Sequence, residues 1–480
     1  MKSNRFCRTI SMLLVVMMVF GIAGCAKEEE KTVVVIEPME KEEVLTYSFD
    51  MIGGTDVMPL VGYYGPNTDQ FGINGIMSPD MLTADMFELI KGVGINMISY
   101  VNMQYQKQDA KRNIFTILEL AEKHGMGFFV EDERWRNATN QDPKVAQQMI
   151  SEMISEYAHY SSFAGIHMPD ELGHATLLDT DAWHPGKRID QVDYAFLAIK
   201  ELGYFANGNL YPMTTMGSDR EKWTKYIRDY IEACQPEVLA YDYYMFNENG
   251  VNTDMFFAHL AIAREESEKA GIPFWGYIQN GYYFNDQGQR ADTIPDFPNR
   301  GQYLWNVGCT LAYGAKVMQF FTLNCPGWYA YTTDGSMDPQ RGGFIGPYGS
   351  KTRWYQYGKE ILAQIAAVDE VLMNSVHKGV IATNDDIKTD LGTTNYLIKG
   401  TSWRELKGVK GDALIGCFNY NGKTALYVVN YDMEYAQHIT LDFVNKYDVT
   451  VTQSAKESHH TGDSLTLTLS AGNSALVVFE

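Results

Sequence analysis

The feature that most constrains the fold is an alternation of short apolar runs with amphipathic helical stretches, repeated eight times between residues 58 and 372. Each run is typical of a buried strand, and each following stretch has apolar residues at helical spacing. The runs span residues 58–66, 95–103, 126–135, 163–171, 210–217, 237–246, 272–280 and 317–327. Eight such units in unbroken series predict an α/β fold, a closed (β/α)8 TIM barrel. A doubly wound open sheet is the alternative.

From about residue 376 the pattern changes to short alternating runs separated by Gly-containing turns, as in DALIGCFNYNGKTALYVVNYD. Alternation with a period of two is typical of strands with one buried face, and Asn-Gly favours a hairpin turn. We therefore expect a TIM-barrel catalytic domain over residues 45–375, followed by a small antiparallel β-sandwich domain over residues 376–480. The short connection between them predicts that the β-domain packs on the barrel as a fixed partner.

The first 24 residues have the pattern of a signal peptide, with basic residues before an apolar stretch too short for a comfortable membrane helix. The stretch ends in IAGC, residues 22–25, which resembles a bacterial lipobox. That resemblance implies that Cys25 is lipidated, so we expect a cell-surface or periplasmic protein anchored to a bacterial membrane. An ordinary signal peptide or an uncleaved anchor is the alternative. Residues 25–44 are mostly charged and are expected to form a flexible tether.

The charge of the chain limits its partners. The formal net charge is −21, and removing residues 1–24 takes away three positive charges and no negative ones, which leaves about −24. A strongly acidic surface argues against binding nucleic acid and against electrostatic adhesion to anionic lipid. It suits neutral or cationic ligands. Aromatic residues make up 13% of the chain, which is compatible with rings that stack on sugar faces.

Four cysteines lie beyond the lipobox, Cys234, Cys309, Cys325 and Cys417. None forms a CxxC pair, which argues against a zinc site, and we expect neither a metal nor another cofactor. Buried thiols are the expected state. A disulfide between Cys309 and Cys325 is the alternative, because sequence alone does not fix pairing.

Candidate catalytic residues follow from the barrel itself, because the loops after the strands meet at one face. The run FAGIHMPDE ends in Asp170 and Glu171, and the run EVLAYDYYMF contributes Asp242. We predict these three as catalytic, since acids supply proton transfer or nucleophilic attack. Capping or ion pairing is the competing interpretation for each acid taken alone. Asp170 and Glu171 can both point inward only if the chain is already turning there.

The same strand ends carry acids, amides and rings that would bind sugar hydroxyls or stack on sugar faces. The predicted substrate-binding residues are Glu131, Asp132, Trp135, Tyr241, Tyr243, Trp275, Gln279, Asn280, Asn324 and Trp328. Core packing is the alternative for the two tryptophans Trp275 and Trp328. Alternation puts Tyr241 and Tyr243 on one side of their strand and Asp242 on the other, and leaves open which side faces the barrel axis.

The segments GIHMPDE, AYDYYMF, PFWGYIQN and AYGAKVMQFFTLNCPGWY resemble strands of TIM-barrel glycoside hydrolases. A barrel with a small β-domain on a lipoprotein is similar to clan-A enzymes such as the family 42 β-galactosidase-type barrels. The resemblance implies a hydrolase of an extracellular oligo- or polysaccharide, with Glu171 as general acid/base at the end of strand four. Clan A has Asn where this chain has Asp170. It also has a Glu nucleophile ending strand seven, where this chain has no acid between Gly271 and Asn285.

Two further resemblances accommodate these departures. In the hexosaminidase and chitinase groups, Asp170 would orient an acetamido group that acts as the nucleophile, Glu171 would be the acid/base, and Tyr241 would assist. In a clan-D arrangement, one acid on strand four and Asp242 would be the nucleophile and the acid/base. A non-catalytic carbohydrate-binding surface lipoprotein is the alternative from another class, because it could keep the rings and amides without a nucleophile. In every case the expected partners are a carbohydrate and, through lipid alone, a membrane.

Overall fold

The computed structural model describes residues 34–66, 81–99, 110–138, 141–178, 186–247, 250–281, 298–325 and 342–480. Residues Ile36–Glu480 form one compact unit. Cys25, the expected lipidation site, lies outside the described residues. Among the helices of the described ranges, none has the length and apolar character needed to cross a membrane.

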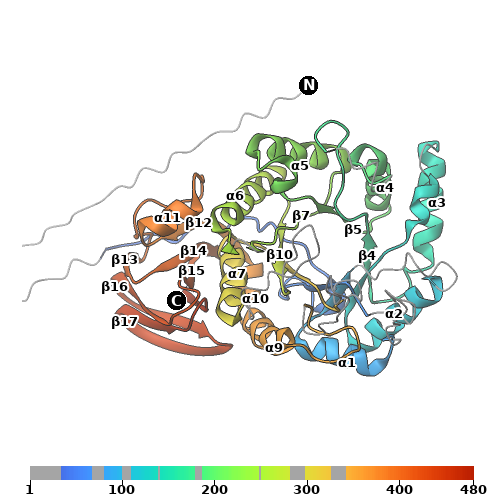
Figure 1. Cartoon of the computed structure of the whole chain (residues 1–480). Helices are drawn as coiled ribbons and strands as arrows, with labels where there is room; N and C mark the ends of the chain where they lie inside the picture. The colour runs from blue at the N-terminus through green and yellow to red at the C-terminus, as the bar shows by residue number, and fades with distance from the viewer. Residues whose placement is uncertain are drawn as a thin grey trace, which may run out of the picture. The chain divides into compact units, whose positions relative to one another are not determined.

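Parallel strands close into a barrel, as the strand–helix rhythm predicts (Figure 1). The strands are β1 (Leu60–Tyr63), β2 (Met97–Ser99), β3 (Gly127–Val130), β4 (Phe163–His167), β5 (Ala206–Asn207), β6 (Asn209–Leu210), β7 (Leu239–Tyr241), β10 (Phe274–Gln279) and β11 (Val317–Phe321). The first strand, β1, pairs with both β2 and β11. Only Gly208 separates β5, which pairs with β4, from β6, which pairs with β7, so these two share the fifth position. The predicted (β/α)8 barrel is therefore confirmed.

The fifth strand lies earlier than the expected 210–217. It covers residues 206–210, and Met213–Met216 forms the 3-10 helix η3. Pro212, just before η3, has no N–H to give to a strand ladder. The segment Asn207-Gly208-Asn209 has the composition of a turn, yet both asparagines are buried. A Cβ atom on Gly208 would lie 2.6 Å from the ring of Phe196, which belongs to helix α4 (Ile189–Glu201). A glycine is therefore needed where α4 approaches the strand.

Helices follow the strands and surround them (Figure 1). They are α1 (Ala84–Val93), α2 (Ala110–His124), α3 (Pro143–Ser155), α4 (Ile189–Glu201), α5 (Arg220–Cys234), α6 (Thr253–Ala270), α7 (Arg300–Ala312) and α9 (Arg353–Ala366), with the shorter η1 (Asp50–Ile52), η2 (Glu133–Ala138), α10 (Asp369–Met373) and α11 (Asp385–Leu391). Several begin at a side chain that accepts a backbone N–H, for example Thr83, Asp142, Asp219 and Asn299. These caps fix where the loops leave the strands.

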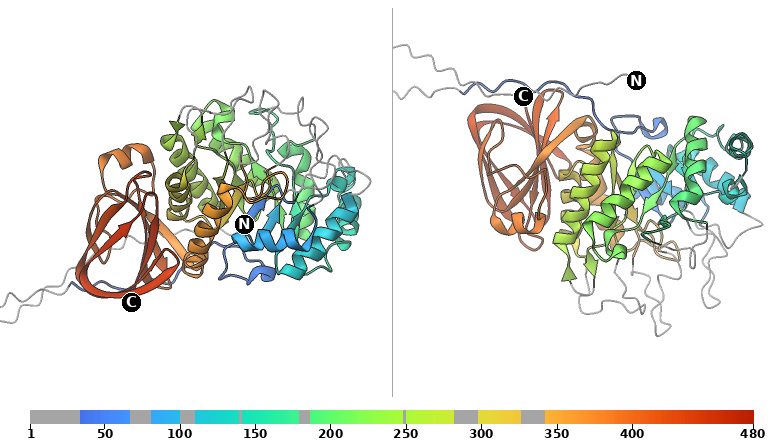
Figure 2. Two further views of the ribbon diagram at one scale, coloured as in Figure 1. Left: turned by 60° about the horizontal axis from the view of Figure 1, so that its bottom comes forward. Right: turned by 90° about the horizontal axis from the view of Figure 1, so that it is seen from above.

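The C-terminal domain is one antiparallel sheet that curls around an apolar core, drawn from orange to red in Figure 2. Its strands are β12 (Ser375–Ala382), β13 (Leu406–Lys410), β14 (Ala413–Tyr420), β15 (Lys423–Asn430), β16 (Gln437–Gln453), β17 (Lys456–Leu469) and β18 (Ser474–Phe479). The long β16 pairs with β17 along its length, with β13 in its first half and with β18 in its second. This shared strand bends the sheet into a half-barrel. Before the C-terminal domain, between β7 and α6, a separate two-stranded ribbon pairs β8 (Phe246–Asn247) with β9 (Gly250–Val251).

The β-domain packs on the barrel through α7, as the short connection predicts. Alternate residues of β14 divide between two cores. Ile415 and Cys417 join the core of the β-domain, whereas Leu414 and Phe418 join the core that includes the barrel helices. A Cβ atom on Gly308 of α7 would lie 3.1 Å from Val429, so the two surfaces approach closely.

The later part of the expected tether lies along the β-domain. The Met39 N–H donates to the Gly422 carbonyl at 3.1 Å. The Asn419 amide donates to the Glu40 carbonyl at 2.7 Å and to Glu42 at 2.8 Å. Residues 39–42 therefore add backbone and side-chain contacts to the fold.

The cysteines are buried, as expected. Cys234, Cys309 and Cys417 are thiols, and burial raises the pKa of each. Because Cys309 forms no disulfide, the alternative pairing with the equally buried Cys325 does not occur in this structure.

Candidate active site

A pocket of about 210 Å³ opens at the carboxyl ends of the barrel strands. Its lining comes from six strand positions around the barrel and consists of Tyr63, Tyr64, Asp170, Glu171, Asn209, Asp242, Tyr244, Tyr277 and Phe321. Active sites of TIM-barrel enzymes lie at this face. The three predicted catalytic acids therefore meet in one pocket, although they come from two different strand ends.

The backbone explains how two adjacent acids reach the same pocket. In a straight strand Asp170 and Glu171 would point to opposite faces. Glu171 instead has a φ of 55°, in the left-handed region that few non-glycine residues adopt. The chain turns at this residue, and the Leu172 N–H then bonds to the Asn209 carbonyl at 3.2 Å. Such backbone conformations cost energy and cluster at functional sites.

Burial and like charge keep a proton on Glu171. Burial is the largest cause that raises its pKa, to about 9, followed by the negative charges of Asp242 and Asp170. Lys187 and a hydrogen bond with Tyr211 act in the opposite direction and are smaller. A carboxyl group with this pKa is protonated at neutral pH and can donate its proton.

Asp242 has the same tendency. Burial and then the charge of Asp170 raise its pKa to about 8, and hydrogen bonds with Tyr244 and Asn209 partly offset this. The Asn209 amide also donates to Asp170 Oδ1 at 2.9 Å. Asn209 therefore links the acid after β4 to the acid after β7. Asn209 was not among the predicted site residues, because the fifth strand was expected to begin at residue 210.

Aromatic rings form the remaining wall. The ring of Tyr64 lies 5.1 Å from that of Tyr63 and 5.8 Å from that of Phe321, which in turn lies 5.0 Å from Tyr244. The hydroxyl of Tyr277 has no hydrogen-bond partner within the described ranges. We did not predict Tyr63, Tyr64 or Phe321 as site residues, because an aromatic residue on an apolar strand is usually part of the core.

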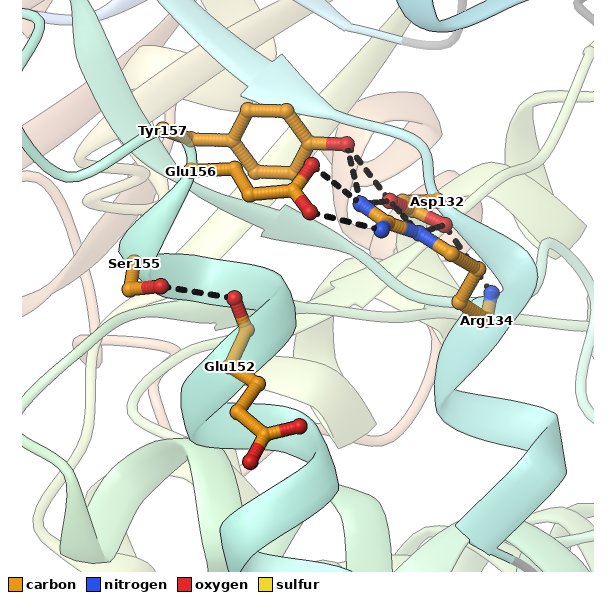
Figure 3. A network of polar contacts seen from close by, with 6 residues as sticks. All are labelled: Asp132, Arg134, Glu152, Ser155, Glu156 and Tyr157. Atoms are coloured by element: carbon orange, nitrogen blue, oxygen red, sulfur yellow. Dashed lines mark hydrogen bonds and ion pairs between the residues drawn. The ribbon is translucent and has the colours of Figure 1, made fainter.

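Asp132, a predicted substrate-binding residue, is instead part of an ion-pair network (Figure 3). Arg134 donates to Asp132 Oδ2 from Nε at 2.8 Å and from Nη2 at 2.6 Å, and the Tyr157 hydroxyl donates to the same oxygen at 2.6 Å. Arg134 also pairs with Glu156 at 3.0 Å. The competing interpretation of Asp132, ion pairing, fits this geometry. The neighbouring Glu131 is half-buried and is not among the residues that line the pocket.

The two predicted tyrosines of the sixth barrel strand point away from the pocket. Tyr241 and Tyr243 both stack on His259 of α6, with ring centroids 5.6 and 4.3 Å apart. The opposite side of the strand carries Asp242 and Tyr244 into the pocket. This settles which side faces the barrel axis and places Tyr241 outside the pocket.

The two predicted tryptophans within the described residues belong to the core. Trp135 is 2% exposed, and its carbonyl accepts a hydrogen bond from Tyr194 at 2.8 Å. Trp275 is fully buried in the barrel interior and stacks on Phe205 with centroids 5.8 Å apart. Neither ring is placed to stack on a sugar in the pocket. Trp328 lies outside the described residues.

The predicted amides hold the backbone. Gln279 bonds to both the N–H and the carbonyl of Phe246, at 3.1 and 2.8 Å. Asn280 donates to the Thr322 carbonyl at 2.7 Å. Asn324 is fully buried, and none of the three lines the pocket. In the part of the chain that the structure describes, no group of three or more His, Cys, Asp or Glu side chains could hold a metal ion.

No protein-family model matches the sequence, and no curated protein matches it either. Among solved structures, a family 39 glycoside hydrolase from the gut symbiont Bacteroides cellulosilyticus WH2 matches with a TM-score of 0.50 and 12% identity, over 89% of this chain and 82% of its own. A β-galactosidase from the psychrophilic Marinomonas ef1 has a TM-score of 0.46 and 12% identity, over 68% of this chain and 63% of its own. A GH27 β-L-arabinopyranosidase from Geobacillus stearothermophilus has a TM-score of 0.46 and 10% identity, over 88% of this chain and 96% of its own.

This chain thus spans less than two thirds of the length of the Marinomonas β-galactosidase chain, at 63%. An identity of 12% to the family 39 structure is far too low to carry activity from one protein to the other. The likeness shows the fold, a TIM barrel with an additional β-domain.

Proposed function

We propose that the protein is a glycoside hydrolase that acts on an extracellular oligo- or polysaccharide, with Glu171 as the general acid/base. The observation that carries the proposal is the position and protonation of Glu171. Its carboxyl lies in the pocket at the end of β4, and burial and neighbouring acids raise its pKa to about 9. A carboxyl group that keeps its proton at neutral pH can protonate the oxygen of a leaving sugar. The fold shared with the family 39 glycoside hydrolase supports this reaction class.

The other acids have complementary roles in this proposal. As the leaving group departs, positive charge develops at the anomeric carbon. The negative charge of Asp170, which raises the pKa of both neighbours, would stabilise that charge or orient an acetamido group of the substrate. In a clan-D arrangement, Asp242 would share the work of nucleophile and acid/base with an acid on β4. The clan-A arrangement has less support, because β10 ends in Gln279, whose amide is occupied by Phe246.

Because β10 ends in Gln279 and not in an acid that could be a nucleophile, a second candidate function is favoured, a carbohydrate-binding protein that does not cleave its ligand. Such a protein needs the pocket and its rings but no nucleophile. It would bind glycans through the same residues and leave every glycosidic bond intact.

The test is a screen of the purified protein against aryl glycosides and polysaccharides, with Glu171→Gln in parallel. Hydrolysis that depends on Glu171 would support the proposal. Binding of glycans without cleavage would put the binding protein in its place. If neither cleavage nor binding occurred with any glycan, both candidates would be wrong.

We also propose that the protein is anchored outside the cytoplasm by lipid on Cys25. The support is the IAGC box after a basic and then apolar leader. Cys25→Ala should release the protein from the membrane fraction and abolish labelling with a radioactive or clickable fatty acid. Unchanged fractionation and labelling would show that the anchor does not exist.

A further inference from the structure

The charge of the pocket is one-sided. Within the described residues, three carboxyl groups line it, those of Asp170, Glu171 and Asp242, and no basic side chain does. The other lining residues are one amide, four phenols and Phe321. Glycoside hydrolysis commonly uses two carboxyl groups, whereas this pocket is lined by three.

Two buried polar atoms in the lining also lack partners. Asp242 is 7% exposed, and its Oδ1 has no hydrogen-bond partner among the described residues. Tyr277 is 5% exposed, and its hydroxyl is equally without a partner there. Buried polar atoms are almost always hydrogen-bonded in folded proteins, so these two atoms point to a ligand that satisfies them. In its carboxylate form Asp242 accepts hydrogen bonds only, so a ligand that displaces its proton would supply a donor to Oδ1.

We propose that the pocket accepts a sugar unit that carries a positive charge, a protonated amino sugar whose ammonium group lies against Asp242 and Asp170. The inference rests on the proposed function for the glycosidic part of the ligand and deepens it by naming a substrate class. An ammonium group has three donors and no acceptor, which suits carboxylate oxygens. Tyr64, Tyr244 and Phe321 line the same pocket, and aromatic rings attract a cation that lies over their faces.

One cation lies near the acids but leaves this charge balance in place. Lys187 is half-buried and is not among the lining residues, and its influence on Glu171 is smaller than those of burial and the two aspartates. The phenols of Tyr211 and Tyr244 are neutral hydrogen-bonding partners. The pocket therefore favours a ligand that brings positive charge with it.

Binding of a cation has a consequence that binding of a neutral sugar lacks. A positive charge beside carboxyl groups lowers their pKa. Because the pKa values of Glu171 and Asp242 are raised in the unliganded pocket, an arriving ammonium group should displace a proton into solution. A neutral or N-acetylated sugar should displace none.

The experiment is isothermal titration calorimetry on the full chain at about pH 6, where sugar amines are protonated. The ligands are the methyl glycosides of glucosamine and galactosamine, with their N-acetylated and unmodified counterparts. Titrations in two buffers of different ionisation enthalpy report the protons released. We expect one of the amino sugars to bind about 10-fold or more tightly than its neutral counterparts. We also expect it to release up to about one proton.

Variants sharpen the result. Asp242→Asn should remove the preference for the amine, whereas Asp385→Asn, an acid on α11 with a side chain 95% exposed, should leave it unchanged. The comparison of ligands on the native chain stands even if Asp242→Asn does not fold. The inference is overturned if the N-acetylated or unmodified sugars bind as tightly as the amines, if the amines bind without proton release, or if no glycoside binds.

These outcomes separate the inference from the proposed function. Hydrolysis of neutral or N-acetylated glycosides without a preference for amines would leave the hydrolase in place and remove the amino-sugar class. A preference for amines with proton release, but no hydrolysis of any glycoside, would leave the inference in place and remove the hydrolase.

Discussion

The ends of β3 and β4 have similar sequences, but their acids lie in different surroundings. Both strands run from apolar residues into acids, Asp132 after β3 and Asp170 with Glu171 after β4. Asp132 meets Arg134, which binds it through two nitrogens, and the hydroxyl of Tyr157 (Figure 3). The acids after β4 meet each other and Asp242.

The difference shows that the neighbours of an acid, rather than its position in the sequence, decide what it does. A carboxylate beside an arginine is satisfied in its ionised form and contributes to stability. A carboxyl group beside other carboxyl groups in a buried pocket holds its proton, because two adjacent negative charges are costly there. The first arrangement stabilises the fold, and the second suits the proposed role of a proton donor.

The largest expected effect is on catalysis by Glu171→Gln. The substitution preserves volume and removes the titrating proton, so hydrolysis of substrates with poor leaving groups should fall about 100- to 10,000-fold while binding changes little. Activated aryl glycosides should lose less, because they need little protonation. The matched control is Glu131→Gln at the end of β3, which should keep activity within about twofold. Equal losses in the two variants would remove the contrast between the strand ends.

A smaller effect is expected from Asp170→Asn, which removes one of the charges that raise the pKa of Glu171. In the proposed mechanism the acid form of Glu171 is the active one, so activity should be lost as pH rises through this pKa. With the neighbouring charge gone, the pKa falls and the alkaline limb of kcat/KM should move to lower pH by about one unit or more. A limb that stays in place would mean that Asp170 does not act on Glu171. A selective loss on N-acetylated substrates would favour the substrate-assisted mechanism.

The sequence predicted the barrel well because its strands and helices are specified by apolar periodicity, which is a direct trace of burial. The fifth strand was predicted too late in the chain, because Asn207 and Asn209, which are buried in the barrel, look like turn residues in the sequence. The acids Asp170, Glu171 and Asp242, which line one pocket, could be selected from the sequence because they stand out against apolar strands.

The rest of the site could not be predicted for physical reasons. Alternation cannot say which side of a strand faces the axis, so the pocket residue Tyr244 and the core residue Tyr241 were indistinguishable. The rings of Tyr63 and Phe321 look like core residues in sequence. Arg134, the ion-pair partner of Asp132, lies only two residues further along the chain. A spacing of two residues does not by itself predict an ion pair.

Next in size is the stability effect at β3. Asp132→Asn removes the charge that two nitrogens of Arg134 contact, and Arg134 keeps Glu156 as its partner. We expect a loss of about 1–3 kcal/mol in the free energy of unfolding, with activity nearly unchanged. Urea denaturation and a standard kinetic assay measure both. Lost activity in a folded Asp132→Asn protein would return Asp132 to the site.

The smallest effect is expected where an acid is paired but exposed. Glu42 pairs with Lys378 at 2.9 Å, and both side chains are more than one third exposed, at 39% and 34%. Exposed pairs contribute about 0–1 kcal/mol because water and salt screen them. Glu42→Gln should therefore change the free energy of unfolding by less than Asp132→Asn does. A larger loss than that of Asp132→Asn would mean that the contacts of residues 39–42 matter more than exposure indicates.

The central claim is that Glu171 carries a proton in the unliganded pocket at neutral pH. Infrared difference spectroscopy between the native protein and Glu171→Gln measures this directly, because protonated and ionised carboxyl groups absorb at different frequencies. The prediction is a protonated carboxyl band that is present at neutral pH, is lost as pH rises through about 9, and is absent from the variant. An ionised carboxylate signal for Glu171 throughout the neutral range would contradict the claim, and with it the role of Glu171 as a general acid.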